Sequence, residues 1–147
     1  MDAGWRHSAV RVARSPIAGR GLFATAPLGA GIPVVRIADA AVAIATSSDE
    51  IDCVNHSCDP NLGWGDSTTL VTLRDVEAGQ ELTSDYAMAT TDPAFLLRCH
   101  CETYRCRQLV TGDDWRIPQL QRRYAGHWAP AVERLLSAVD SADNVGP

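Results

Sequence analysis

The sequence places three cysteines, Cys99, Cys101 and Cys106, within eight residues. Their C-x-C-x4-C spacing holds three thiols near one point, but a structural zinc ion takes four ligands at about 2.3 Å in a tetrahedron. The chain has five cysteines in all, and the other two, Cys53 and Cys58, lie far upstream. A metal site built on this cluster therefore requires a fold that brings a distant segment back to it.

Other interpretations of the cluster stay open at this point. Buried free thiols are common, because cysteine is among the most buried residues, but a polar segment flanked by arginines is a poor place for them. A redox pair is the least favoured interpretation, because the cluster lacks the C-x-x-C spacing. His100 could replace one cysteine as a ligand, although its place between two presumed ligands disfavours it. The pattern favours metal.

The composition is that of one globular domain of 147 residues, with 46% apolar and 21% charged residues. The net charge of −5 gives no basic footprint for nucleic acid. No apolar run is long enough to span a membrane. The N-terminus lacks the apolar region of a secretory signal, so a reducing cytosol is expected. There, clustered cysteines bind metal more often than they form disulfides.

Short strand-like runs separated by turn signals fill the first two thirds of the chain. The runs include "LFAT", "IPVVRI" and "TLVTLRDV", and "TLVTLRDVEAGQELTSDY" is predicted to form a hairpin. The last third predicts helices. Pro118 opens one that runs toward Tyr124, with Asp113 or Asp114 as caps. Pro130 opens a second helix, whose apolar face at helical spacing is Val132, Leu135, Leu136 and Val139; Trp115 and Trp128 are expected to cover the β part with it.

Four segments in order, "AGRGLFAT", "NHSCDPN", "ELTSDYA" and "CHCETYRC", resemble the SET-domain family of protein lysine methyltransferases with a post-SET cysteine motif. The resemblance spans roughly Val10 to Val110. It implies a mainly β (β+α) fold of short strands in small sheets around a knot-like core, with a C-terminal post-SET zinc site and helices. In that core, "NHSCDPN" and "ELTSDY" run parallel.

The implied division is a SET domain over 8–90, a post-SET zinc segment over 95–112, and a helical extension over 113–140 packed on the same domain. The short, self-contained chain looks most similar to microbial members.

The resemblance also implies an enzyme that transfers a methyl group from S-adenosylmethionine to the ε-amine of a lysine, leaving S-adenosylhomocysteine. Tyr86 matches the catalytic tyrosine, and we expect it to orient the amine. Asn61 and Asp85 are expected to hold the core, and Cys53 to pack as a small apolar residue. The implied cofactor-binding residues are Gly19, Arg20, Gly21, Asn55, His56, Tyr86 and Leu109, the last over the adenine. The implied ligands of the structural zinc are Cys58, Cys99, Cys101 and Cys106.

Three features depart from the family pattern. Ser84 stands where an aromatic residue often limits the number of methyl groups added. The interval from Gly21 to Asn55 is short, so "IADAAVAIATSSDE" offers little wall for a peptide groove, and a tyrosine-glycine motif before "NHSC" is absent. Two alternatives follow: a catalytically weak or inactive SET-type binding module, or methyl transfer to a small amine or a ribosomal-type protein. The expected partner is a histone or other protein with a target lysine, without nucleic acid or membrane. A cytoplasmic location is expected, nuclear in a eukaryote, and the choice between monomer and homodimer stays open.

Overall fold

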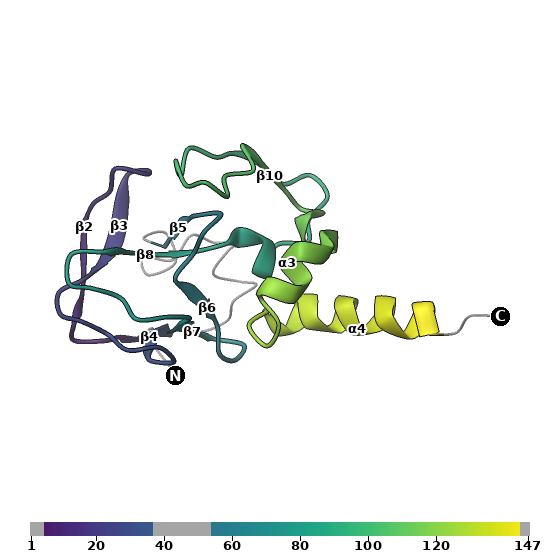
Figure 1. Cartoon of the computed structure of the whole chain (residues 1–147), viewed down its shortest axis with the longest axis horizontal. Helices are drawn as coiled ribbons and strands as arrows, with labels where there is room; N and C mark the ends of the chain where they lie inside the picture. Colours follow the sequence, from purple (N-terminus) through teal and green to yellow (C-terminus); the bar gives the residue numbers. More distant parts are fainter. Residues whose placement is uncertain (1–4, 37–53, 145–147) are drawn as a thin grey trace.

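The computed structural model of the chain describes residues 5–36 and 54–144. Within them, short strands form the body and helices follow (Figure 1). The strands are β1 (Trp5–Arg6), β2 (Val10–Arg14), β3 (Arg20–Ala24), β4 (Pro33–Arg36), β5 (Asn55–His56), β6 (Leu62–Trp64), β7 (Thr69–Thr72), β8 (Glu81–Ser84), β9 (Leu96–Arg98) and β10 (Leu109–Thr111). The helices are the 3-10 turns η1 (Tyr86–Met88) and η2 (Asp114–Arg116) and the α-helices α3 (Pro118–Arg123) and α4 (Pro130–Asn144).

The main sheet has the strand order β1-β4-β7-β6-β8-β3-β2, and β5 joins it by pairing with β8. The β5–β8 pair is parallel, with Asn55 opposite Thr83 and His56 opposite Ser84. This is the parallel contact expected between "NHSCDPN" and "ELTSDY". It sets the first residues of "NHSCDPN" beside the middle residues of "ELTSDY", so two distant polar segments share one site. The prediction of a mainly β fold with helices at the C-terminus is confirmed.

The predicted hairpin is wrong. β7 and β8 are not neighbours, because β6 lies between them, antiparallel to β7 and parallel to β8. The "EAGQ" turn does reverse the chain, with Gly79 at φ +88°, but Val76 just before it bridges to Leu28. The chain that leaves β7 is thereby carried to another part of the sheet. Turn chemistry alone could not reveal the intervening strand.

Aliphatic side chains fill the space between the sheet and the helices. Leu22, Leu62 and Leu82 are fully buried on neighbouring strands, and Val132 of α4 joins the same cluster. Burial of each such side chain stabilises the fold by about 1.5–3 kcal/mol. The core therefore ties the C-terminal helices to the same body as the strands.

The two helices begin at the predicted prolines, Pro118 and Pro130. The predicted caps are wrong: the N-cap of α3 is Ile117, without a side-chain hydrogen bond. Asp114 instead accepts a hydrogen bond from the guanidinium of Arg107. Val132 is fully buried, whereas Leu135 and Val139 remain more than one third exposed. The first half of α4 lies against the body, where Leu136 also packs on the core, and the last turns extend beyond it (Figure 1).

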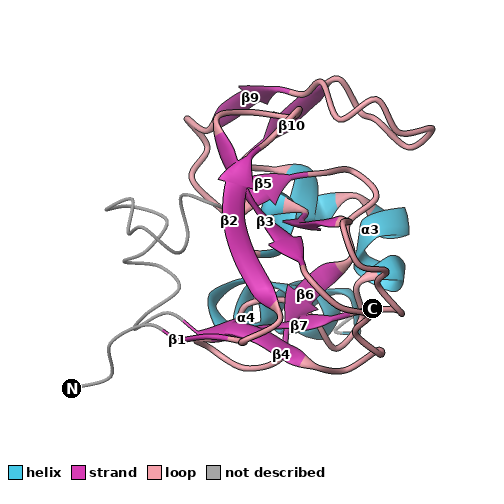
Figure 2. Cartoon of the chain, turned by 90° about the vertical axis from the view of Figure 1, so that its left-hand side faces the viewer, coloured by secondary structure: helices cyan, strands magenta, loops and turns pink. Residues whose placement is uncertain are grey.

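A second, two-stranded sheet holds β9 and β10 in antiparallel pairing. In both views this hairpin lies beside the end of the main sheet where β2 passes into β3 (Figures 1 and 2). Val110 at its centre is fully buried with Cys58 and Cys99 in a separate small cluster. Gly112 follows β10 at a point where a Cβ would overlap the Asp92 carbonyl. Among the described residues, no helix has the length and apolarity needed to cross a bilayer.

Candidate active site and metal centre

Four cysteine sulfurs meet at one point beneath the β9–β10 hairpin. The Sγ atoms of Cys58, Cys99, Cys101 and Cys106 all lie within 4.8 Å of one another. Bond lengths of about 2.3 Å put the sulfurs of a tetrahedral zinc site about 3.8 Å apart. The Sγ atoms of Cys58 and Cys99 are separated by 3.8 Å. The four residues named from the sequence therefore have the donor set and spacing of a structural zinc site.

Two backbone amides donate hydrogen bonds to these sulfurs, which favours the thiolate form that binds a metal cation. The Arg107 N–H donates to Cys58 Sγ at 3.3 Å, and the Cys101 N–H donates to Cys99 Sγ at 3.4 Å. Burial raises the pKa of the Cys58 thiol to about 11, so Cys58 stays protonated at neutral pH unless a metal ion displaces the proton. The alternative ligand His100 is exposed and outside the four-sulfur group. Cys53 lies outside the described residues.

His56 links this sulfur cluster to Tyr86. Its Nδ1 accepts a hydrogen bond from the Tyr86 N–H at 3.0 Å, and its Nε2 lies 3.3 Å from Cys58 Sγ. Because Nδ1 is an acceptor, the ring proton of neutral His56 belongs on Nε2, where it points at the sulfur. Burial lowers the pKa of His56 to about 4, and the charge of Arg107 acts in the same direction. The neutral imidazole ring therefore lies between Cys58 of the four-sulfur group and Tyr86.

We expect His56 to remain neutral, with its proton on Nε2, far below its ordinary pKa of 6.5. Since the folded-state pKa is lowered, the unfolded chain takes up a proton first as pH falls. The contribution of neutral His56 to the free energy of unfolding is therefore complete above pH 6.5 and is lost as pH falls toward about 4. Nitrogen-15 NMR of the imidazole across this range measures the tautomer and charge. An imidazolium signal for His56 at pH 6 would contradict the assignment.

Tyr86 opens η1 one residue after β8 ends, and hydrogen bonds hold both its side chain and its backbone. Its hydroxyl donates to the Val54 carbonyl at 2.6 Å, while its N–H is bound to His56. The ring meets the rings of His56 and Phe95 edge-on, with centroids 5.2 Å and 6.4 Å away. Tyr86 keeps partial exposure among buried neighbours. The structure thus fixes the Tyr86 hydroxyl against the carbonyl of Val54, the residue just before β5.

Asp85 anchors the backbone that carries Tyr86. This carboxylate is fully buried and caps η1 by accepting from the Ala87 N–H at 3.0 Å. Arg107 donates to both of its oxygens, at 2.7 Å and 3.0 Å, and Tyr124 donates its hydroxyl at 2.8 Å. Burial acts to raise the pKa of Asp85, but the hydrogen bonds and charge of Arg107 outweigh burial and hold that pKa below its ordinary value. Asp85 is therefore ionised and saturated with donors.

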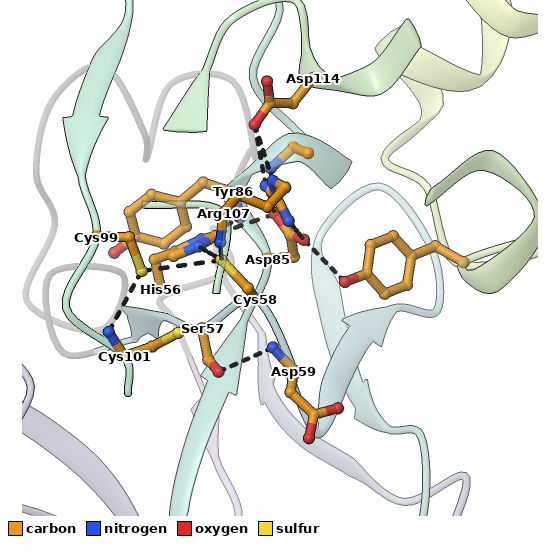
Figure 3. A network of polar contacts seen from close by, with 12 residues as sticks. His56, Ser57, Cys58, Asp59, Asp85, Tyr86, Cys99, Cys101, Arg107 and Asp114 are labelled. Atoms are coloured by element: carbon orange, nitrogen blue, oxygen red, sulfur yellow. Dashed lines mark hydrogen bonds and ion pairs between the residues drawn. The ribbon is translucent and has the colours of Figure 1, made fainter. Parts of the chain in front are cut away.

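Arg107 joins the metal centre to this anchor. It follows the ligand Cys106 directly, and its guanidinium lies between Asp85 and Asp114, with its Nε 3.1 Å from Asp114 Oδ2. Figure 3 shows His56, Cys58, Asp85, Tyr86 and Arg107 converging in one polar network. Two carboxylates around one guanidinium raise the pKa of Arg107, so its charge is permanent. The backbone of Arg107 thus contacts the cysteine cluster, while its guanidinium connects the Tyr86 turn and η2 through charged hydrogen bonds.

The glycine loop between β2 and β3 lies against Asn55. The Asn55 amide donates to the Ala18 and Arg20 carbonyls at 3.1 Å each, and to Glu81 Oε2 at 2.8 Å. A Cβ on Gly21 would collide with the Glu81 carboxylate, which explains the glycine. Asn55 therefore shapes this loop with its side chain.

Three cofactor residues expected from the sequence are exposed. Gly19, at φ +45°, and Arg20 are exposed residues at the β2–β3 turn, although their carbonyls accept hydrogen bonds from the Ser15 N–H and the Asn55 amide. Leu109 is 48% exposed on the hairpin that lies beside this turn. A turn with no side chain at Gly19, beside an exposed apolar side chain, fits a ligand with an apolar part and a polar part. The residues present therefore fit the expected cofactor.

Sequence reasoning missed four residues of this site: Glu81, Arg107, Asp114 and Tyr124. Glu81 has a signal, because it is the one charged residue in "ELTSDY" besides Asp85. Arg107 also has a signal, because it directly follows the last cysteine of the cluster. An arginine at that position can reach the segments that a bound metal would bring together. Asp114 and Tyr124 carry no local signal, since their roles depend on contacts across the fold.

Comparisons with known proteins agree with this geometry. The family model described as "SET domain" matches residues 41–87. "Histone-lysine N-methyltransferase ash1" of Drosophila melanogaster is 36% identical over 91 residues, covering 56% of this chain and 4% of that protein. "Histone-lysine N-methyltransferase TRX1" of Oryza sativa subsp. japonica is 35% identical over 91 residues, covering 56% of this chain and 9% of that protein. The chain thus spans less than a tenth of these relatives, and their insect and plant sources leave the expected microbial origin a prediction.

A solved structure shares the fold. It is described as "crystal structure of KRYPTONITE in complex with mCHG DNA and SAH" and matches with a TM-score of 0.52 at 22% identity. The match covers 68% of this chain and 28% of that one. The matched motifs, the parallel β5–β8 pair and the shared fold lead to one conclusion: the part of the chain that the family model matches is a SET domain.

Proposed function

We propose that this protein transfers a methyl group from S-adenosylmethionine to the ε-amine of a lysine in a protein substrate. The observation that carries the proposal is the Tyr86 hydroxyl, fixed on the Val54 carbonyl at 2.6 Å where the two SET motifs pair in parallel. The relatives named histone-lysine N-methyltransferase support the reaction type. They also make a histone or another lysine-bearing protein the proposed substrate.

Tyr86 acts in this proposal as an orienting group. Its proton is donated to the Val54 carbonyl, so its oxygen offers lone pairs to an incoming amine or to polarised methyl hydrogens. A lysine amine has an ordinary pKa of about 10.4 and must be neutral to attack. Desolvation beside Tyr86 favours the neutral amine. When bound, the cofactor supplies an electrophilic sulfonium methyl group.

The remaining roles are proposed on the positions described above. Gly19, Arg20 and Gly21 offer loop backbone to the methionine part of the cofactor, with Asn55 and His56 beside them, and Leu109 covers the adenine. Cys58, Cys99, Cys101 and Cys106 hold a structural zinc ion. We propose the same division as from the sequence: a SET domain (8–90), a post-SET segment (95–112) and a helical extension (113–140). We further propose action in the cytoplasm, or in the nucleus of a eukaryote, without direct binding of nucleic acid.

The test is methyl transfer by the zinc-loaded protein and by Tyr86→Phe, with methyl-labelled cofactor and a mixed protein lysate. We expect label on protein lysines, and a loss of about 10²–10³-fold in the variant, the usual effect of removing one positioned polar group at a reacting centre. Tyr104→Phe is the matched control, because Tyr104 is 83% exposed and should leave the rate unchanged.

Each outcome separates one candidate function. Label only in small molecules would replace the protein substrate with a small amine. Cofactor binding without any transfer would favour the inactive binding module. Equal rates in Tyr86→Phe and the wild type would refute the role of Tyr86.

A further inference from the structure

We infer that Tyr124, in the helical extension beyond the post-SET segment, is a positioning residue for Tyr86 that acts through Asp85. The inference rests on the proposed role of Tyr86 and adds a contribution from the extension. Tyr124 lies at the C-terminal end of α3 and is 1% exposed. Its hydroxyl donates to Asp85 Oδ2 at 2.8 Å, one residue before Tyr86. No sequence motif suggests this contact.

The extension holds both ends of the turn that carries Tyr86. At the start of η1, Tyr124 binds the carboxylate that caps it. At the end of η1, the Ala129 N–H donates to the Met88 carbonyl at 2.9 Å. The segment between these two residues also contacts the sheet, because the His127 carbonyl accepts from the Trp64 N–H at 2.9 Å. Residues 124–129 thus form a clamp around η1.

We expect the loss of the Tyr124 hydroxyl to move the Asp85 carboxylate, because both of its oxygens are held by shared donors. Oδ2 accepts from Tyr124 and Arg107, while Oδ1 accepts from Arg107 and the Ala87 N–H. Without the hydroxyl, Arg107 is the remaining donor among these contacts to Oδ2. The carboxylate is fully buried, so water is poorly placed to replace a lost donor. We expect the carboxylate to turn toward Arg107, which loosens its bond to Ala87 and tilts η1.

A tilt of η1 moves the Tyr86 hydroxyl relative to the substrate. Displacements of 1 Å at a reacting group can reduce a rate about 10²-fold. Because the expected movement is smaller, we expect kcat of Tyr124→Phe to fall about tenfold. The KM for cofactor should change less than kcat, since the glycine loop is held by hydrogen bonds from Asn55 and not by η1.

Tyrosine NMR measures the coupling independently of any reaction. The chain has three tyrosines, Tyr86, Tyr104 and Tyr124, so carbon-13 labelling at Cζ gives three signals that single Phe variants assign. In zinc-loaded Tyr124→Phe, we expect the Tyr86 signal to shift and the Tyr104 signal to stay. The Phe ring keeps the edge-on contact with Trp128, at 5.8 Å between centroids, so the shift reports the lost hydroxyl.

Val132→Ala is the control for a purely structural effect. Val132 is fully buried in the core at the start of α4, and its truncation lowers the unfolding midpoint without removing a donor to Asp85. We expect unchanged Tyr86 signal and kcat in this variant below its unfolding temperature. An equal shift and rate loss in Val132→Ala would overturn the inference, because general loosening of the extension would then explain both.

Three further outcomes test whether Tyr124 positions Tyr86. An unmoved Tyr86 signal in Tyr124→Phe overturns the inference, whatever the rate. A moved signal with unchanged kcat overturns the positioning role. If the wild type transfers no methyl group, the proposed function fails; the Tyr86 signal then decides alone whether Tyr124 positions Tyr86.

Discussion

Cys58→Ser is expected to reduce bound zinc from about one ion per chain to nearly none. Cys58 comes from the segment after β5, whereas its three partners lie between residues 99 and 106. Losing it removes the only ligand in the four-sulfur group that ties the post-SET segment to the main sheet. Structural zinc contributes folding free energy outright, on the order of 10–16 kcal/mol in small zinc-binding peptides. We therefore expect residues 95–112 to lose their order in this variant.

The consequence should extend beyond the metal. Arg107 donates its N–H to Cys58 and its guanidinium to Asp85, so release of the segment removes the main partner of a buried carboxylate. Leu109 moves away with the same segment. Cofactor affinity should therefore fall at least tenfold, by calorimetry, after chelation of the wild type as well as in Cys58→Ser.

Cys53→Ser is the matched control, since Cys53 is the one cysteine outside the four-sulfur group. Metal analysis should find its zinc content equal to that of the wild type. Full metal content in Cys58→Ser would refute the four-cysteine assignment. Unchanged cofactor affinity after chelation would refute the link between the metal and the active site.

The sequence predicted the parts of this site whose spacing is local. "NHSCDPN", "ELTSDYA" and the cysteine cluster are each shorter than ten residues, and their resemblance to the SET-domain family marked Tyr86 and the four cysteines as candidates before any fold was known. The family resemblance supplied the pairing of the first two motifs. Their parallel pairing then brings Asn55 and His56 beside β8.

Contacts between distant segments were not predictable in the same way. The hairpin prediction failed because β6 inserts between two strands that are consecutive in the sequence apart from a turn. The cap prediction failed because Asp114 sits 3.1 Å from the Arg107 guanidinium, and a charged partner outweighs a backbone amide. Both failed predictions concern the choice between several possible strand or side-chain partners, and this choice depends on the whole fold.

Asp85→Asn is expected to destabilise the zinc-loaded protein by about 3–5 kcal/mol, the usual cost of breaking a buried ion pair from one side. Asp85 is fully buried, and Arg107 keeps only 16% of its side chain exposed. An amide nitrogen in place of Oδ1 or Oδ2 would face donors from Arg107, Tyr124 or Ala87. A buried donor facing donors leaves hydrogen bonds unmade, and Arg107 loses the closer of its two carboxylates.

The control is Asp113→Asn, the same chemical change at the surface. Asp113 pairs with Arg116 at 3.6 Å, and both side chains are more than 60% exposed, so its loss should cost less than about 1 kcal/mol. Urea unfolding of both variants measures the difference. A cost below 1 kcal/mol for Asp85→Asn would show that Arg107 is satisfied by Asp114 alone.

The pH dependence gives a second measure of Asp85. Because its folded-state pKa is lowered, its stabilising contribution is complete above the ordinary pKa and is lost as pH falls through the lowered value. Asp85→Asn removes this titration, so the gap in stability between wild type and variant should narrow as pH is lowered through the acid range. If the gap stays constant with pH, the charge of Asp85 contributes nothing, and η1 is held in place by packing rather than by the ion pair.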